Sequence, residues 1–311
     1  MTEIKTRKRN NSITSFRNFI SKQNSISSAI SQISEEAFVR LCDNAIFRRT
    51  LSGAIPQRDP TSWLFLVGCY NSGTTLLQHL LSAHPEVSGL PREGVRFTNY
   101  LSNLELNGHH MIWDDEWQSV AKPGEMESAE VVTQIKRDWL MFWKRNAKIF
   151  MDKSVSNTAR IEWLDRNFGN TKFIGISRNG YCVAEGLHRR CRPPDWLKEE
   201  TGLNNYPLVK TASQWAMINE VMLSTIGSTN HFLIRFEDLV SDPVFALSEV
   251  FEFLELEQPK MEFKNQELII ARKSFQIFDP NPGSLQRLGD RKQEIMELVS
   301  PIMSKLGYDN D

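Results

Sequence analysis

The sequence predicts an α/β protein of three layers, in which a central parallel sheet is flanked by helices on both faces. Short apolar runs, typical of strands covered on both sides, recur at residues 63–67, 148–153, 172–177 and 231–235. Segments of helical periodicity lie between these runs, and a strand, helix and strand in this order form a right-handed parallel unit. Such a sheet binds ligands at the carboxyl ends of its strands.

The first strand, residues 63–67, ends in a loop suited to an anion. The loop covers residues 68–75 (GCYNSGTT), and leucines at helical spacing follow it. The loop therefore lies at the amino end of a helix, where unpaired N–H groups and the helix dipole attract negative charge. Ser72, Thr74 and Thr75 add hydroxyl donors.

The same loop differs from a nucleoside triphosphatase P-loop at one decisive position. Its two glycines have the P-loop spacing, but Thr74 stands where that motif has the lysine that reaches the β- and γ-phosphates. The loop therefore suits a single phosphate. On this loop alone, small and hydroxylated residues that merely cap a helix are an equally good interpretation.

Length and composition narrow the function classes. The 311 residues suit one large α/β domain with a short extra segment, and the net charge of -1 disfavours a broad nucleic-acid surface. The four cysteines show no metal-ligand spacing and no dense disulfide framework, so we expect no metal. Three of them fall in or next to apolar elements, where we expect buried free thiols. No apolar run has transmembrane length and no secretory signal opens the chain, so a cytoplasmic location is expected.

The chain divides into three parts by composition. Residues 1–35 are rich in Ser, Asn, Lys and Arg, which predicts a weakly ordered basic arm. Residues 36–62 form a helical lead-in, with helical periodicity over 35–51 and a proline-bounded break at 56–60. Residues 63–311 carry the predicted sheet and its helices.

A turn-rich segment, residues 86–96, follows the first helix and places Glu93 between Arg92 and Arg96. A carboxylate there is a candidate base, although a surface ion pair with either arginine is the simpler interpretation. Beyond it, we expect an acidic loop or lid at 113–127 and an amphipathic helix at 131–148.

Two later strands end in cationic residues. The strand at 148–153 ends in Lys153, and the strand at 172–177 is followed by Arg178. A helix then opens at Gly180, and Arg190 lies three turns along it, so both arginines reach one ligand only if Arg178 precedes the helix. Because parallel strands present their carboxyl ends at one edge, we expect the loop, Lys153 and Arg178 to gather there.

The remaining elements follow from helical periodicity and turn signals. We expect a strand at 231–235, helices at 157–168, 208–226, 242–256 and 291–306, and irregular structure over 257–289.

Several motifs follow one another in a fixed order over residues 63–309: SGTT at 72–75 with His84 and Pro85 after its helix, KFIGISRNG at 172–180, Trp215, RFEDLVSDP at 235–243 and MSKLGYD at 303–309. In this order they resemble the sulfotransferases that use 3'-phosphoadenosine 5'-phosphosulfate (PAPS), and the branch they resemble most is that of the tyrosylprotein sulfotransferase and related bacterial enzymes. The resemblance implies a P-loop fold like that of nucleotide kinases, and a sulfotransferase domain at 63–311.

The resemblance also implies a nucleotide site. The loop residues Asn71, Ser72, Gly73, Thr74 and Thr75 would hold the 5'-phosphosulfate. Relatives commonly have Lys or Arg at the position of Asn71, whose amide can donate to the bridging oxygen but carries no charge.

Further along the chain, Arg178 would bind the 3'-phosphate together with a serine eight residues on, a position occupied here by Gly186. Arg190 matches a further arginine of the family. Arg272 and Lys273 would close over the nucleotide.

Two catalytic residues follow from the same resemblance. Glu93 matches the catalytic glutamate of the tyrosylprotein enzymes if one residue is inserted, and would act as general base. Lys153 matches a lysine that often follows the second strand, and it or Arg92 would supply the cation that Asn71 lacks.

The sequence thus predicts transfer of a sulfuryl group from PAPS to a hydroxyl or amine, leaving PAP, without a metal. The expected acceptor is a sugar, a lipid head group or a small metabolite. A catalytically silent PAPS- or PAP-binding module is an alternative, motivated by Asn71 and Gly186. A small-molecule kinase is disfavoured because Thr74 replaces the P-loop lysine. The sequence does not predict an oligomeric state.

Overall fold

The computed structural model describes residues 35–42, 44–52, 59–101, 111–112, 129–144 and 147–308. The predicted basic arm, apart from its last residue, and the predicted lid at 113–127 lie outside the described residues.

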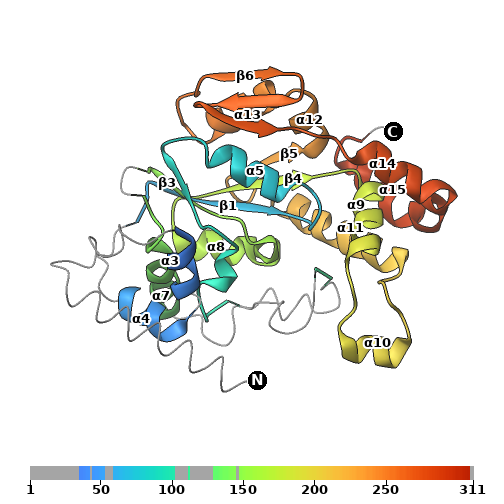
Figure 1. Cartoon of the computed structure of the whole chain (residues 1–311), viewed down its shortest axis with the longest axis horizontal. Coiled ribbons are helices and arrows are strands. Elements are labelled where there is room, and N and C mark those ends of the chain that lie inside the picture. The colour runs from blue at the N-terminus through green and yellow to red at the C-terminus, as the bar shows by residue number, and fades with distance from the viewer. Residues whose placement is uncertain are drawn as a thin grey trace.

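A five-stranded parallel sheet forms the centre of the molecule, as predicted (Figure 1). Its strands lie in the order β2 (Val87–Gly89), β3 (Ile149–Asp152), β1 (Ser62–Gly68), β4 (Thr171–Ser177) and β5 (His231–Arg235). β2 lies in the segment for which the sequence predicted turns. The three central strands are those whose carboxyl ends were expected to carry Lys153, the loop and Arg178.

The side chains of β1 alternate between two cores, because successive residues of a strand point to opposite faces. Trp63, Phe65 and Val67 belong to one buried cluster, and Leu64 and Leu66 belong to the other. All five are at most 1 % exposed. The central strand is therefore covered on both faces, which is why its sequence is an unbroken apolar run.

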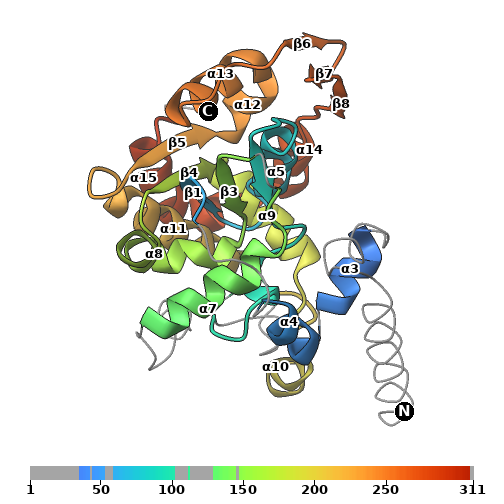
Figure 2. The ribbon, with the colours of Figure 1, turned by 90° about the vertical axis from the view of Figure 1, so that its left-hand side faces the viewer.

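Helices cover the two faces of the sheet in separate groups (Figures 1 and 2). The cluster around Trp63 includes side chains from α3 (Glu35–Cys42), α4 (Ala45–Ser52), α7 (Ala129–Leu140) and α8 (Ile161–Phe168). The cluster around Leu64 includes α5 (Thr74–Leu81), α12 (Phe236–Ser241) and α13 (Pro243–Phe253). A third cluster joins α9 (Gly180–Arg190), α11 (Leu208–Thr225) and α15 (Met296–Lys305). The predicted α/β class is confirmed.

The C-terminal segment corrects one prediction. Residues 257–289, expected to be irregular, contain a three-stranded antiparallel sheet and a helix, formed by β6 (Met261–Lys264), β7 (Glu267–Ile270), β8 (Lys273–Gln276) and α14 (Asn281–Leu288). In Figure 2 this small sheet lies beyond α12 and α13, on the outer side of the molecule.

The hairpins escaped prediction because their turns lack glycine. Asn265 and Gln266 have φ of 51° and 63°, and Ala271 and Arg272 have φ of 47° and 74°. Positive φ at both central residues is the geometry of a two-residue hairpin turn, which Asn-Gly or Gly-Gly usually signals. Without that signal, strands of four residues are too short for their alternation of apolar and polar residues to be recognised in the sequence.

Several helix boundaries also differ from the sequence prediction. The helix expected at 131–148 ends at Leu140, and the one expected from 157 begins as a 3-10 helix, η3 (Val155–Arg160). The lead-in helix divides into α3 and α4, because the Asn44 side chain accepts the N–H groups of Ile46 and Phe47 and starts a new helix. Shorter elements complete the fold: α10 (Asp195–Thr201), η1 (Gly94–Arg96) and η4 (Gly289–Ile295).

The four cysteines are buried free thiols, as expected for cysteines in apolar elements. Among the described helices, none combines the length and the apolar character that crossing a membrane requires.

Candidate active site

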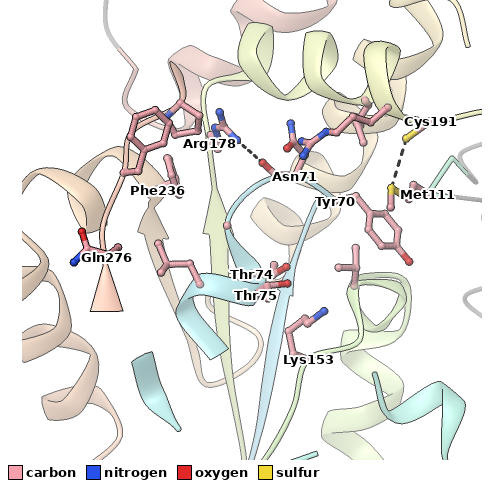
Figure 3. A pocket seen from close by; sticks show the side chains of 17 residues that line it. Tyr70, Asn71, Thr74, Thr75, Met111, Lys153, Arg178, Cys191, Phe236 and Gln276 are labelled. Carbon is pink, nitrogen blue, oxygen red and sulfur yellow. Dashed lines mark hydrogen bonds between the residues drawn. The ribbon is translucent and has the colours of Figure 1, made fainter. Parts of the chain in front are cut away.

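A pocket of about 500 Å³ opens at the carboxyl ends of β3, β1 and β4 (Figure 3). Its lining includes Asn71 and Thr74 from the loop after β1, Lys153 from the end of β3 and Arg178 from the end of β4. The structure thus brings together the three features that the sequence placed at one edge of the sheet. Arg190, the last residue of α9, lines the same pocket as Arg178, which precedes that helix.

The loop adopts a conformation that depends on Gly73. This residue has φ of 96°, and a Cβ atom built on it would lie 2.5 Å from the ring of Phe236. Asn71 also has a positive φ, of 70°, which asparagine tolerates better than most residues. The N-cap residue of α5 is Gly73, which has no side chain to cap the helix, and Thr74 and Thr75 of the first turn line the pocket. The N–H groups of this turn are therefore open to a ligand there. This arrangement is a general anion site.

The buried hydroxyl of Ser72 tests whether a phosphate group fits the loop. Ser72 is 0 % exposed, and within the described structure its Oγ has no hydrogen-bond partner. A buried hydroxyl without a partner is costly, and an anionic oxygen at this helix end would accept its hydrogen bond. The loop residues therefore fit a phosphate-like group.

Arg178 is a largely buried cation held from three sides. Its Nε donates to Oδ1 of Asn281 at 2.7 Å, a terminal nitrogen donates to the carbonyl of Asn71 at 2.8 Å, and its guanidinium lies 4.8 Å from the ring centre of Phe236. Burial lowers the pKa of Arg178 below its ordinary value and outweighs the opposite effects of Cys182, Glu237 and Asp279, while the charge of Arg190 adds a smaller lowering. An anion beside Arg178 would relieve both effects.

Glu93 and Lys153 form a partly buried ion pair. Their Oε1 and Nζ atoms are 3.1 Å apart, and the side chains are 17 % and 12 % exposed. Lys153 lines the pocket, whereas Glu93, the N-cap residue of η1, is not among the lining residues. The predicted base is therefore held next to the pocket through its pair with the predicted cation.

Asp152 fixes the backbone on both sides of this ion pair. Its carboxylate is 1 % exposed and accepts hydrogen bonds from the Gly94 N–H at 2.8 Å, the Ser154 hydroxyl at 3.0 Å and the Asn157 amide at 2.6 Å. Burial raises the pKa of Asp152 to about 6, against the effect of these hydrogen bonds. Because Gly94 follows Glu93 and Asp152 precedes Lys153, one carboxylate positions both residues.

The comparison with known proteins identifies the family. Residues 64–260 match the model of the sulfotransferase family, which is more than half of the chain. The chain belongs to the sulfotransferase family. The predicted resemblance and the prediction of an enzyme of this class are confirmed.

Among curated relatives, the chain is 23 % identical to protein-tyrosine sulfotransferase A of Caenorhabditis elegans, over 79 % of this chain and 67 % of that protein. It is 22 % identical to the omega-hydroxy-beta-dihydromenaquinone-9 sulfotransferase Stf3 of Mycobacterium bovis, over 86 % of this chain and 80 % of that protein. Among solved structures, the sulfotransferase domain from the curacin biosynthetic pathway matches with a TM-score of 0.49 and 20 % identity, covering 81 % of this chain and 99 % of that chain.

Two residues predicted to close over the nucleotide lie elsewhere in this sulfotransferase. Arg272 and Lys273 are not among the residues that line the pocket, and the Lys273 ammonium donates to the carbonyl of Ser82 at 3.2 Å. The same segment instead lines the pocket with Gln276, Phe278 and Pro280. Arg272 lies in the turn before β8 and Lys273 begins that strand, so the chain reaches the pocket only at Gln276, where β8 ends.

Gly186 is a buried residue of α9, and a Cβ atom built on it would meet the side chain of Asn71. The Arg190 Nε donates to its carbonyl at 3.2 Å. The two positions at which the chain departs from the pattern of its relatives are therefore neighbours in space.

Sequence reasoning missed Asp152 and Phe236. Asp152 ends a buried strand beside a lysine, where an aspartate looks like a surface charge until its hydrogen bonds are known. Phe236 directly follows β5, so the rule that ligands lie at the carboxyl ends of strands would have found it.

Proposed function

We propose that this sulfotransferase moves a sulfuryl group from PAPS to a hydroxyl or amine of a sugar, a lipid head group or a small metabolite. One observation carries the proposal: an uncapped helix amino end, the partly buried Lys153 and the buried Arg178 face the same pocket. This set of donors suits a nucleotide with several anionic groups and no metal-bound triphosphate.

The loop would hold the 5'-phosphosulfate of PAPS. The N–H groups of the first turn of α5 and the hydroxyls of Ser72, Thr74 and Thr75 supply donors, and Lys153 supplies the positive charge. PAPS contributes an activated sulfuryl group when it is bound. The chain positions the reacting groups and supplies positive charge. By analogy with phosphoryl transfer, a loose transition state mainly requires these two contributions.

Glu93 would act as general base at the acceptor. The acceptor oxygen forms its bond to sulfur as its proton passes to the Glu93 carboxylate, and the electron pair of the broken bond stays on the departing phosphate. Lys153 and the loop donors then stabilise that phosphate, a contribution of about 3 to 4 kcal/mol for one well-placed donor. The 3.1 Å pairing with Lys153 keeps Glu93 beside the reacting end of the pocket.

The apolar part of the pocket lining favours a small or partly apolar acceptor. Met111, Val155 and Leu187 belong to this lining. Apolar walls with a few placed polar groups are typical of sites for small molecules. A long polyanionic acceptor would need cationic walls instead.

Calorimetric titration with PAP tests the nucleotide site. We expect wild-type protein to bind PAP and to ignore ATP with magnesium, and Arg178→Ala to weaken PAP binding at least about tenfold, as expected for loss of a charged hydrogen-bond partner. Arg189→Ala is the matched control, because this neighbouring arginine is half exposed and pairs with Glu185. Absence of PAP binding to the wild type would refute the proposal, and ATP binding would favour a kinase.

Turnover separates the enzyme from a silent binding module. PAP release from PAPS is measured against a panel of sugars, lipid head groups and phenols. Release with one acceptor class, abolished in Glu93→Gln, is the expected result. PAP binding without turnover on any acceptor would favour the silent module, for which Asn71 and Gly186 are the specific observations.

A further inference from the structure

The carboxamide of Asn71 occupies the space next to the missing side chain of Gly186. A Cβ atom built on Gly186 would lie 2.2 Å from Nδ2 of Asn71 and 3.1 Å from its Cγ. The first distance is shorter than real Cβ contacts, so a side chain at position 186 would displace the Asn71 amide from its present place. The Asn71 side chain of the loop after β1 therefore fits against α9 because position 186 is a glycine.

Two guanidinium groups border the same point. A terminal nitrogen of Arg190 lies 3.2 Å from the Cβ position of Gly186, and Arg178 donates to the carbonyl of Asn71 at 2.8 Å. The charge of Arg190 lowers the pKa of Arg178 in addition to the effect of burial. Like charges in a partly buried place favour the binding of an anion between them.

The Asn71 amide has donor capacity left for such an anion. Its Nδ2 lies 3.5 Å from the carbonyl of Val183, at the outer limit of a hydrogen bond. Since an NH₂ group carries two donors, at least one is available to a ligand in the pocket, which Asn71 lines. The amide thus adds a neutral donor to the two cations.

The pocket consequently has two anion-binding ends. Figure 3 shows Asn71 and Arg178 together on one side of Thr74 and Thr75, and Lys153 on the other side. A nucleotide with a phosphate at each end of its ribose would match both. AMP, which lacks the 3'-phosphate, would match only the end at Lys153.

We propose that Asn71 binds the 3'-phosphate of the donor together with Arg178 and Arg190, and so replaces the donor group that Gly186 cannot supply. This inference rests on the proposed PAPS-dependent function. From its position in the loop alone, the Asn71 amide was expected to donate to the bridging oxygen of the 5'-phosphosulfate. Asn71 is assigned here to the opposite end of the pocket, beside the 3'-phosphate. Asn71 and Gly186 would then act together to favour nucleotides that carry a 3'-phosphate over those that lack it.

The decisive measurement compares the affinities for PAP and for AMP. In Asn71→Ala, the affinity for PAP should fall about tenfold or more, as expected for the loss of a hydrogen bond to a charged group, while the affinity for AMP stays unchanged. Asn71→Asp, of equal size but with a carboxylate in place of the donor, should weaken PAP binding further. Thr75→Ala is the control for the opposite end and should weaken both nucleotides by the same factor.

A double-mutant cycle tests the matched pair. Gly186→Ser alone should weaken PAP binding, because the new side chain collides with the Asn71 amide. The double variant Asn71→Ala/Gly186→Ser should bind PAP more tightly than either single variant, since the new hydroxyl then has room beside Arg178 and Arg190. Such recovery is a coupling that independent sites do not show.

The outcomes distinguish this inference from the proposed function. If Asn71→Ala changes the PAP and AMP affinities by equal factors, or changes neither, the assignment of Asn71 is wrong while the PAPS site stands. If the wild type binds no PAP, the proposed function is wrong and the inference is overturned with it. Circular dichroism melting of each variant shows whether a loss of affinity reflects a loss of fold.

Discussion

At the scale of single residues, the ion pair between Glu93 and Lys153 is expected to affect the rate of sulfuryl transfer more than the affinity for PAP. Lys153→Ala removes the charge nearest the expected leaving phosphate, so kcat should fall about 100- to 1,000-fold. The affinity for PAP should stay close to that of the wild type, because Arg178 and the loop donors remain. Lys148→Ala is the matched control, since Lys148 directly precedes β3, at the end of the strand opposite Lys153, and pairs with Glu86 at 2.6 Å. Equal losses of PAP affinity and kcat in Lys153→Ala would contradict the assigned role.

Gly94 provides a second residue-scale prediction, because it leaves no room for a side chain. A Cβ atom there would lie 2.7 Å from the Trp139 ring and 2.8 Å from Cγ of Asp152. Gly94→Ala should therefore destabilise the protein by about 1 to 3 kcal/mol and move Glu93 away from the acceptor, lowering kcat.

Urea unfolding and initial rates measure the two effects of Gly94→Ala. The control is Gly283→Ala in α14, where the nearest atom is the flexible end of Arg287 at 3.3 Å. Alanine has the higher helix propensity, so this control should be neutral or stabilising by up to about 1 kcal/mol. Unaltered kcat in a folded Gly94→Ala variant would show that Asp152 and Gly94 do not position the base.

At the scale of elements, the small antiparallel sheet supports the pocket from outside. β7 turns Leu268 and Ile270 inward at 0 % exposure, whereas Ile269 between them is 38 % exposed. The chain leaves β8 directly into Phe278 and Pro280, which line the pocket, and then into Asn281, which holds Arg178. Weakening the sheet should therefore reach the nucleotide site.

Leu268→Ala tests this connection. It should cost about 2 to 5 kcal/mol of unfolding free energy, as deletion of a fully buried leucine side chain does. It should also lower the affinity for PAP, because the segment that fixes Arg178 loses its anchor. Ile269→Ala, on the same strand but facing outward, should cost about 1 kcal/mol or less and leave PAP binding unchanged. Wild-type PAP affinity in a measurably destabilised Leu268→Ala would separate the sheet from the site.

The same elements show which parts of the fold the sequence could predict. Buried strands such as β1, β3 and β4 contain apolar runs, so the sequence located their carboxyl ends, and with them Lys153 after β3 and Arg178 after β4. The hairpins of the small sheet have turns without glycine, and their register depends on tertiary contacts of Leu268 and Ile270. The contact between Asn71 and Gly186 joins segments far apart in sequence, so no local pattern could reveal it.

At the scale of the whole molecule, the buried Asp152 and the partly buried His231 make the free energy of unfolding depend on pH in opposite directions. Burial raises the pKa of Asp152 from 3.8 to about 6, so the native state binds this proton more tightly than the unfolded chain. Its contribution to stability therefore falls as the pH rises from about 4 to about 6. Burial lowers the pKa of His231 from 6.5 to about 4, so the unfolded chain binds that proton more tightly, and its contribution falls as the pH drops through this range. Each slope is about 1.4 kcal/mol per pH unit, so the two oppose each other between pH 4 and 6.

Removing the histidine should expose the opposing slope. The Nε2 atom of His231 is buried without a hydrogen-bond partner in the described structure, and it would lie 2.7 Å from a Cβ on Gly175, so a proton there has no acceptor. His231→Gln removes the group whose protonation destabilises the folded state at low pH. The difference in unfolding free energy between variant and wild type should therefore shift in favour of the variant by roughly 2 to 3 kcal/mol between pH 7 and pH 4.5, at about 1.4 kcal/mol per pH unit. Urea denaturation of both proteins at four pH values measures this difference, in which the contributions of all other groups cancel. Parallel stability curves for the two proteins would show that His231 binds its proton equally well in the folded and unfolded states.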